Sequence, residues 1–399
     1  MIKAHSLLYS IYICLFVAIF GFVILQYTQI YNKLSIYFQS YEEASIDHLN
    51  KLNFFLKNPS TWNSTTQVDY NDCNIKAVQH GVFKNLTITS FTRKDTLSTS
   101  ILISNESKNK TALYVSNSNK EISYFGNVKI KGDSFIPYKK ITQAYISNSI
   151  KNNLLLQGSV ENSDIVLPKL NPLIVNAYIE TIKKIKLNNK SNTNQFSNSF
   201  ANTTKIIEWH NGSNYNLKGN IILYNKEEIV INRADILTDI IVIAPKVTIN
   251  ENFNGAIQIM AIENIEIKKN VRLNYPSFVL LNNENNIDTN LQIDQDTYIG
   301  GNVVIYSTDI DELNKNKCTI KENTLIIGAI YCNGILNIKG KILGSIYTSR
   351  LLENSNQAER YNTLNDVEIN ALDIPKNYFN CSVIENQEIS NYGVVKKTF

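Results

Sequence analysis

Histidine and cysteine are scarce in this chain, which has four histidines and five cysteines among its 399 residues. So few potential ligands and nucleophiles leave little material for a metal site or a catalytic triad. The sequence also lacks a CxxC pair, a Walker loop and a GxGxxG motif. We therefore expect a protein that is not an enzyme, with no catalytic residue, no metal ligand and no cofactor.

Charged side chains are sparse as well. They make up 19% of the residues against 43% apolar ones, which excludes a disordered chain and a charge-rich coiled coil. A formal net charge of +4 offers no obvious basic face, so we expect neither nucleic acid nor nucleotide as a partner. Asparagine, by contrast, is abundant and fills roughly one position in seven. At this length the chain can build two or three domains with sizeable cores.

One long apolar run stands near the N-terminus. Residues 7–25 read LLYSIYICLFVAIFGFVIL, nineteen residues without a charge. At about 1.5 Å per residue this length matches the hydrocarbon thickness of a bilayer, which predicts a transmembrane anchor with the lipid bilayer as partner. A cleaved signal peptide is the alternative, but the run is followed by Gln26, Tyr27 and Thr28 rather than by a small-x-small cleavage site.

The basic residues around the run predict its orientation. Lys3 and the free amine precede it, and the first basic residue after it is Lys33. The positive-inside rule then places the N-terminus in the cytoplasm and the bulk of the chain outside. We expect a single-pass protein of the bacterial inner membrane whose larger part is periplasmic or extracytoplasmic.

The segment after the run continues as a helix in its pattern. From Gln26 to Lys57 there is neither Gly nor Pro, and Asn58-Pro59 predicts a helix stop. Apolar residues recur at three- and four-residue steps, so 1–58 is expected to form one anchor-and-stalk helix. This shape resembles the N-terminal helix of type IV pilins and pseudopilins. A stalk helix lying against its own domain remains the alternative.

Short alternating stretches follow over 66–167 and indicate strands with one buried face. Examples are Val82–Thr89, Ser100–Ile103 and Ala112–Val115. Leu173–Leu187 is the one expected helix outside the N-terminal segment. We therefore predict a β-rich domain over 59–187, followed by an Asn/Ser-rich linker over 188–220 that includes the mobile, low-complexity stretch 188–204.

A repeat over 221–350 decides the expected fold. Six short segments align, and they begin at Ile229, Val247, Ile265, Leu291, Cys318 and Leu336. The first three starts are spaced eighteen residues apart, as are the last two, and the two wider gaps carry polar insertions. The third position of each segment is always isoleucine, while the second and fourth are mostly polar, as expected when successive side chains point to opposite faces.

Two places beyond four of the six segments stand residues that tolerate a left-handed corner, namely Asn252, Asn270, Asp296 and Asn323. A repeat of this length divides into three faces of about six residues, which predicts a coil of a parallel β-helix with stacked isoleucines inside. A sandwich of hairpins is the alternative, but it would not produce the repeat. The fold class is thus mainly β: a parallel β-helix over 221–350, followed by a C-terminal cap or extension over 351–399.

Residues 327–347, IGAIYCNGILNIKGKILGSIY, carry a resemblance. They look like the repeat of bactofilins, the polymer-forming bacterial cytoskeletal proteins. The resemblance implies a β-helix that joins end to end into filaments without a nucleotide. The order of anchor, β domain and coils also resembles uncharacterised envelope proteins of Bacteroidota, which implies no particular activity.

Isolated polar residues leave some alternatives open. Four acids cluster around one insertion and could form a solvated loop or a weak Ca²⁺ site; they are Asp294, Asp296, Asp309 and Asp311. A Cys73–Cys381 bridge is a further possibility, and Cys318 and Cys332 are expected to be small core residues that do not share one stacked column. Three histidines lie beyond the apolar run and are isolated in the sequence, so we expect them at the surface or as caps; they are His48, His80 and His210.

Two functions remain. The first is a non-enzymatic, membrane-anchored structural or assembly protein of the bacterial envelope that presents a β-helical rod, with protein partners or self-association, in a pilus-like or secretion-type assembly. The second is a glycan-binding or glycan-processing β-helix. Stacked acids or aromatic rings in an outer groove would favour glycan chemistry. The outward columns are bland, which favours the scaffold.

Overall fold

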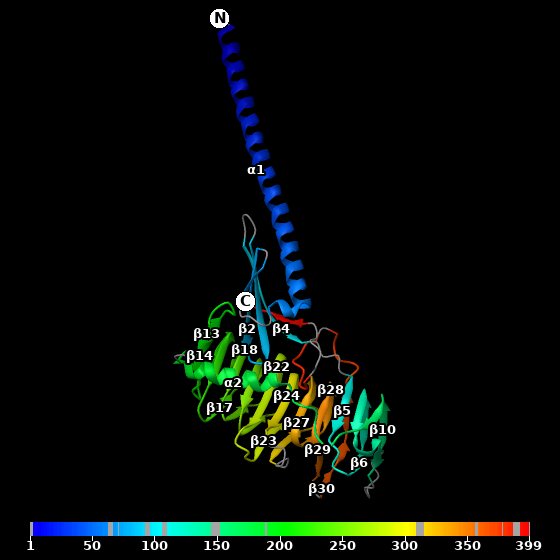
Figure 1. Cartoon of the computed structure of the whole chain (residues 1–399). Helices are drawn as coiled ribbons and strands as arrows, with labels where there is room; N and C mark the ends of the chain where they lie inside the picture. The colour runs from blue at the N-terminus through cyan, green and yellow to red at the C-terminus, as the bar shows by residue number, and fades with distance from the viewer. Residues whose placement is uncertain are drawn as a thin grey trace.

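The computed structural model describes residues 3–62, 67–70, 72–91, 96–105, 110–144, 152–187, 190–308, 315–355, 358–376, 378–385 and 392–398. One long helix, α1 (Lys3–Lys57), projects from a body built mainly of β-strands (Figure 1). At 55 residues it is about 80 Å long. It ends at Lys57, as Asn58-Pro59 predicts, and the short 3₁₀ turn η1 (Pro59–Thr61) follows.

An antiparallel sheet packs against the C-terminal end of α1, which we call its foot. In sheet order its strands are β1 (Gln67–Tyr70), β2 (Cys73–His80), β3 (Phe83–Phe91), β4 (Thr96–Asn105) and β33 (Tyr392–Lys397). Leu52, Phe55 and Trp62 pack with Ile75 and Ile88 of this sheet in one buried cluster. The last strand of the chain therefore closes the sheet on which the first helix stands.

A second sheet contains 25 strands within the described residues, and its pairings along the repeat are parallel, which makes the fold β-helix-like. Its longer part comprises β12 (Lys190–Ser191), β13 (Gln195–Asn198), β14 (Lys205–Glu208), β15 (Asn216–Gly219), β16 (Ile221–Tyr224), β17 (Glu228–Ile231), β18 (Ile236–Ile243), β19 (Lys246–Ile249), β20 (Asn254–Ala261), β21 (Asn264–Ile267), β22 (Arg272–Asn283), β23 (Thr289–Ile293), β24 (Tyr298–Ser307), β25 (Asn316–Ile320), β26 (Leu325–Ile327), β27 (Ile330–Ile338), β28 (Gly340–Leu343), β29 (Ile346–Ser355), β30 (Ala358–Tyr361) and β32 (Val367–Asn370). β30 folds back antiparallel on β29.

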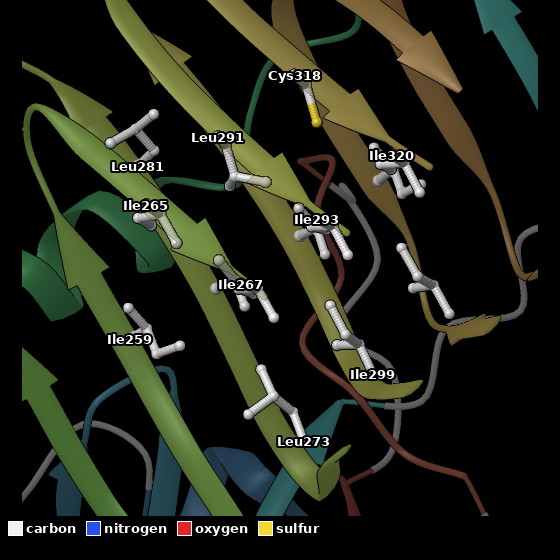
Figure 2. Packing of buried hydrophobic residues seen from close by; sticks show 14 of the residues in the cluster. Ile259, Ile265, Ile267, Leu273, Leu281, Leu291, Ile293, Ile299, Cys318 and Ile320 are labelled. Carbon is white, nitrogen blue, oxygen red and sulfur yellow. The ribbon is translucent and has the colours of Figure 1, made fainter. Parts of the chain in front are cut away.

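The predicted isoleucine column is confirmed. Ile231 pairs with Ile249, which pairs with Ile267, and the series continues through Ile293, Ile320 and Ile338. All six side chains are buried in one core cluster. Figure 2 shows Ile267, Ile293 and Ile320 side by side on neighbouring strands, with Ile265, Leu291 and Cys318 in the next row.

The predicted corner residues are confirmed too. Asn252, Asn270, Asp296 and Asn323 have positive φ angles of 62°, 60°, 59° and 58°. Short polar side chains can hydrogen-bond locally and so tolerate this conformation. They also contact one another across coils: the Asn270 amide lies 3.5 Å from the Asn252 oxygen, and the Asn323 amide donates to Asp296 over 3.2 Å.

The far end of the β-helix comes from an earlier part of the chain. Strands β5 (Thr111–Val115) and β7 (Asn127–Lys131) pair in parallel with β29 and β32. Beyond them lie β8 (Asp133–Ile136), β10 (Asn153–Gln157) and β11 (Val160–Asn162). A third sheet with β6 (Ile122–Phe125), β9 (Ile141–Gln143) and β31 (Thr363–Asn365) sits at the same end, and the 3₁₀ turn η2 (Pro137–Lys139) follows β8.

The observed organisation therefore differs from the predicted division at three places. Residues 111–162, expected within a separate domain over 59–187, contribute strands to the β-helix sheet. The expected linker over 188–220 contains β12 to β15, whose parallel pairing with later strands makes it the beginning of the β-helix. The expected cap over 351–399 is divided, because β32 joins the far end whereas β33 returns to the antiparallel sheet.

Helix α2 (Pro172–Leu187), predicted over 173–187, connects the far end to the start. Figure 1 shows it crossing the strands of the β-helix on their outer side. Its buried Ile174, Ala177 and Tyr178 share a cluster with Ile222 and Ile241 of β16 and β18. Ile240 and Val242, on the opposite face of β18, belong to the inner core. Burial on both faces explains why these strands read as continuous apolar runs.

Candidate functional site

The most conspicuous surface is the free length of α1. Every residue from Ser6 to Glu43 is exposed, although most of the side chains are apolar or aromatic. Among the described residues this is the one helix that is long and apolar enough to cross a membrane. Its apolar side chains do not stop at Leu25, since Tyr27, Ile30 and Leu34 are exposed farther along.

The foot of α1 is held by specific contacts. The indole Nε1 of Trp62 donates to the Phe55 carbonyl over 2.7 Å, and the Trp62 ring lies 5.1 Å from that of Tyr392. The two ring nitrogens of His48 lie 2.8 Å from Ser90 Oγ and 2.9 Å from Thr99 Oγ1. Burial lowers the pKa of His48. The helix is thus fixed to the antiparallel sheet by packing and by directed hydrogen bonds.

Side chains in the outward column of the β-helix interact with one another across neighbouring coils. The Asn250 amide donates to Asn232 over 2.7 Å. Lys321 lies 2.6 Å from the Asp294 carboxylate. The column holds amides, lysines and one acid rather than stacked carboxylates; its members are Asn232, Asn250, Lys268, Asp294, Lys321 and Lys339. Asp294 is the single carboxylate in this column, so the column lacks the two carboxylates that glycoside hydrolysis requires.

The acid cluster predicted around the insertion is only partly within the described residues, because Asp309 and Asp311 lie outside them. Although partial burial opposes ionisation, hydrogen bonds from Lys321 and Gln292 hold the pKa of Asp294 below its ordinary value. Asp296 accepts a hydrogen bond from Asn323. The described part of the chain contains no group of three or more His, Cys, Asp or Glu side chains that could hold a metal ion.

The expectation for the histidines was wrong for two of them. His48 and His80 are buried, whereas His210 is exposed. His80 lies between the antiparallel sheet and the β-helix, where its Nε2 lies 3.0 Å from the Asp239 carbonyl. Burial, with a smaller contribution from Lys184, lowers the pKa of His80 to about 4. Its side chain therefore belongs to an internal junction.

All five cysteines are free. Cys73 and Cys381 belong to different buried clusters and neither is bonded to another cysteine, so the bridge considered between them is absent. Cys318 and Cys332 are core residues as expected. They occupy different columns, because Cys318 pairs with Leu336 whereas Cys332 pairs with Thr348.

A ladder of aromatic rings on the outer side of the β-helix, called the tyrosine ladder below, was not predicted. Tyr331 pairs with Tyr347, Tyr347 with Tyr114, and Tyr114 with Phe135. The segment 164–170 covers this ladder: the hydroxyls of Tyr331 and Tyr114 donate to the carbonyls of Pro168 and Val166 over 3.1 and 3.2 Å. Burial raises the pKa of both Tyr331 and Tyr347.

The ladder could not be found from the repeat, because Tyr114 lies far ahead, in the sequence, of the strand that it joins. Its rings are largely buried, so they build the attachment of a covering segment rather than an open groove. Comparison of the chain with protein-family models, with curated proteins and with solved structures gives no match.

Proposed function

We propose that this chain is a non-enzymatic, membrane-anchored structural or assembly protein of the bacterial cell envelope. One observation carries the proposal: α1 runs unbroken from a fully exposed apolar stretch to a foot buried in the antiparallel sheet. A continuous helix with a packed foot transmits position and orientation from bilayer to body, which a flexible linker would not do.

Residues 7–25 cross the bilayer in this proposal, with the N-terminus in the cytoplasm and the β-helix outside. The exposed residues 26–43 then lie beyond the hydrocarbon layer. Their apolar side chains suit protein partners or further copies of the chain, in a pilus-like or secretion-type assembly.

The repeating unit of the rod is, we propose, a coil of about 18 residues. The pairings of Ile231 with Ile249, of Ile249 with Ile267 and of Ile320 with Ile338 support this size. The two wider steps, on either side of Ile293, carry the polar insertions. The resemblance of 327–347 to the bactofilin repeat supports the same unit.

The alternative is a glycan-binding or glycan-processing β-helix at the cell surface. It would require acids stacked on one open face or exposed rings in a groove. In the outer column, by contrast, Asn250 pairs with Asn232 and Lys321 pairs with Asp294, and the tyrosine ladder lies beneath segment 164–170. These contacts favour a rod whose surface binds other proteins over one that processes glycans.

Two experiments test the proposal. Deletion of residues 1–27 should move the chain from the carbonate-resistant membrane fraction to the soluble fraction. A periplasm-dependent reporter fused after Phe399 should be active, and its cytoplasm-dependent counterpart silent. Retention of the shortened chain in membranes, or activity of only the cytoplasmic reporter, would refute the anchor or its orientation.

A further inference from the structure

A cavity of about 460 Å³ lies beside the segment that covers the tyrosine ladder. Residues from the segment 165–172 form one side of it, and residues of β24, β27 and β29 form the other. This volume falls within the range of about 300–1,000 Å³ that is common for small-molecule sites. The proposed scaffold function does not use this cavity.

The floor of the cavity is a row of neutral polar side chains, one from each successive strand. Ser349 Oγ donates to Asn333 Oδ1 over 3.4 Å, and the Asn333 amide donates to the Ser307 carbonyl over 3.0 Å. Ser116 continues the row, since Thr348 pairs with Val115. Neighbouring strands lie about 4.8 Å apart, so hydroxyl and amide groups recur at that interval.

The hydroxyl at the end of this row is unused. Ser116 is 6% exposed, it lines the cavity, and its Oγ has no hydrogen-bond partner among the described residues. A buried hydroxyl without a partner is unfavourable, and a ligand that enters the cavity can supply one. Ser163 provides a comparison: it is also 6% exposed with an unpartnered Oγ, but it does not line the cavity.

The walls of the cavity are apolar and its charges balance. Val166, Leu167 and Leu170 face the polar row together with the rings of Tyr306 and Tyr331. The charged lining residues are Lys169 and Glu385, one of each sign. A charged ligand therefore finds no net field of the opposite sign, and a purely apolar ligand would leave the hydroxyl row without partners.

We propose that this cavity binds a neutral carbohydrate of one or two sugar units. A sugar ring has an apolar face for the aliphatic and tyrosine walls. Its hydroxyls both donate and accept, which matches serine hydroxyls and an asparagine amide. The site recognises the sugar and leaves it unchanged, because the described part of its lining contains a single carboxylate, Glu385, and no second acid.

The test uses the full chain in a polyoxyethylene detergent, since sugar-headed detergents would compete. Cellobiose and chitobiose are titrated by calorimetry as neutral probes, with glucuronic acid and glucosamine as charged counterparts. We expect millimolar or tighter binding of at least one neutral probe and at least tenfold weaker binding of both charged ones. Ser116→Ala should weaken binding about three- to tenfold, the effect of one lost hydrogen bond.

Ser163→Ala is the matched control, because it removes an equally buried unpartnered hydroxyl outside the cavity and should leave the affinity unchanged. Val166→Trp adds bulk at a rim position that is 54% exposed, where it need not disturb folding, and should abolish binding. Failure of every neutral probe at millimolar concentration would overturn the proposal. So would equal binding of the charged probes, or equal loss in Ser163→Ala and Ser116→Ala. None of these outcomes depends on the membrane anchor.

Discussion

Lys396, in the last strand of the chain, donates hydrogen bonds of 2.8 and 2.7 Å to the two carboxylate oxygens of Asp239 in β18. The Asp239 side chain is 2% exposed, and its backbone has a φ of 59° at a bulge where β18 slips against β20. Bulges re-aim side chains, and this one turns a carboxylate out of the β-helix toward the antiparallel sheet.

Replacement of Lys396 by Met should therefore weaken the junction between the two sheets. The Asp239 carboxylate would remain buried without its cation, at a cost of up to about 3 kcal/mol, the low end for a buried pair because Lys396 keeps a third of its side chain in solvent. Unfolding of the detergent-solubilised chain by urea, followed by tryptophan fluorescence, measures the loss. Lys397→Met, at an exposed neighbouring position, is the control and should change stability by less than about 0.5 kcal/mol.

Acid should weaken the same junction through His80. Its pKa is about 4 in the folded chain and about 6.5 in the unfolded one, so the unfolded state binds more protons between these values. Stability is complete above the unfolded pKa and falls as the pH drops toward the folded one, by about 3 kcal/mol in all. Urea titrations at several pH values measure this slope. His80→Gln should flatten it, while His210→Gln, at an exposed position, should leave it unchanged; an identical slope in both variants would contradict the assignment to His80.

The stacked isoleucines predict an asymmetry between adjacent residues. Ile267 is fully buried between Ile249 and Ile293, and Figure 2 shows it beside Ile293. Glu266 pairs with Thr248 and Gln292 on the other face of the strand, where it is only half-buried. Ile267→Asp buries an unpaired carboxylate and should cost several kcal/mol. Glu266→Lys should cost less than about 1 kcal/mol. Thermal unfolding compares the two variants, and equal effects would argue against the inward orientation of this column.

A charge within the apolar run tests the anchor without deletion. Phe20→Lys places a cation within residues 7–25, where insertion scales give a cost of about 2.5–3.5 kcal/mol at the helix centre. We expect a large fraction of this variant to leave the membrane pellet in fractionation. Gln29→Lys adds the same charge beyond the run and should remain membrane-bound. Loss of both variants from the pellet would indicate that the membrane segment extends past Leu25.

Local periodicity was enough to predict much of the fold. The end of α1 before Pro59, helix α2, the isoleucine column and the left-handed corner at Asn252 all depend on residues close in sequence or at a fixed offset. Segment 190–204 was predicted to be a linker because of its polar composition, and this prediction was wrong. Pairing of Phe196 with Leu217 nevertheless makes it part of the β-helix, since a strand at the end of a stack needs few buried side chains.

Contacts between distant segments could not be predicted. Leu113 pairs with Ile346, and His80 contacts Asp239, with no periodic offset linking either pair. The cavity beside segment 165–172 could not be predicted for the same reason. Ser116 lies next to Ser349 only because β5 pairs with β29 at the far end of the β-helix. An isolated serine carries no pattern that would distinguish it from a surface residue.

The early position of β5 and β7 has a consequence for biosynthesis. Leu113 is translated long before its partner Ile346, which lies about four fifths of the way along the rest of the chain. At about 5–20 residues per second, β5 therefore waits about 10 to 50 s for β29 to leave the ribosome. During that interval a strand whose side chains are all buried in the folded protein lacks its neighbour on the β29 side. The emerging chain should consequently depend on chaperones that shield this segment, and its yield should fall when translation is slowed between residues 115 and 346.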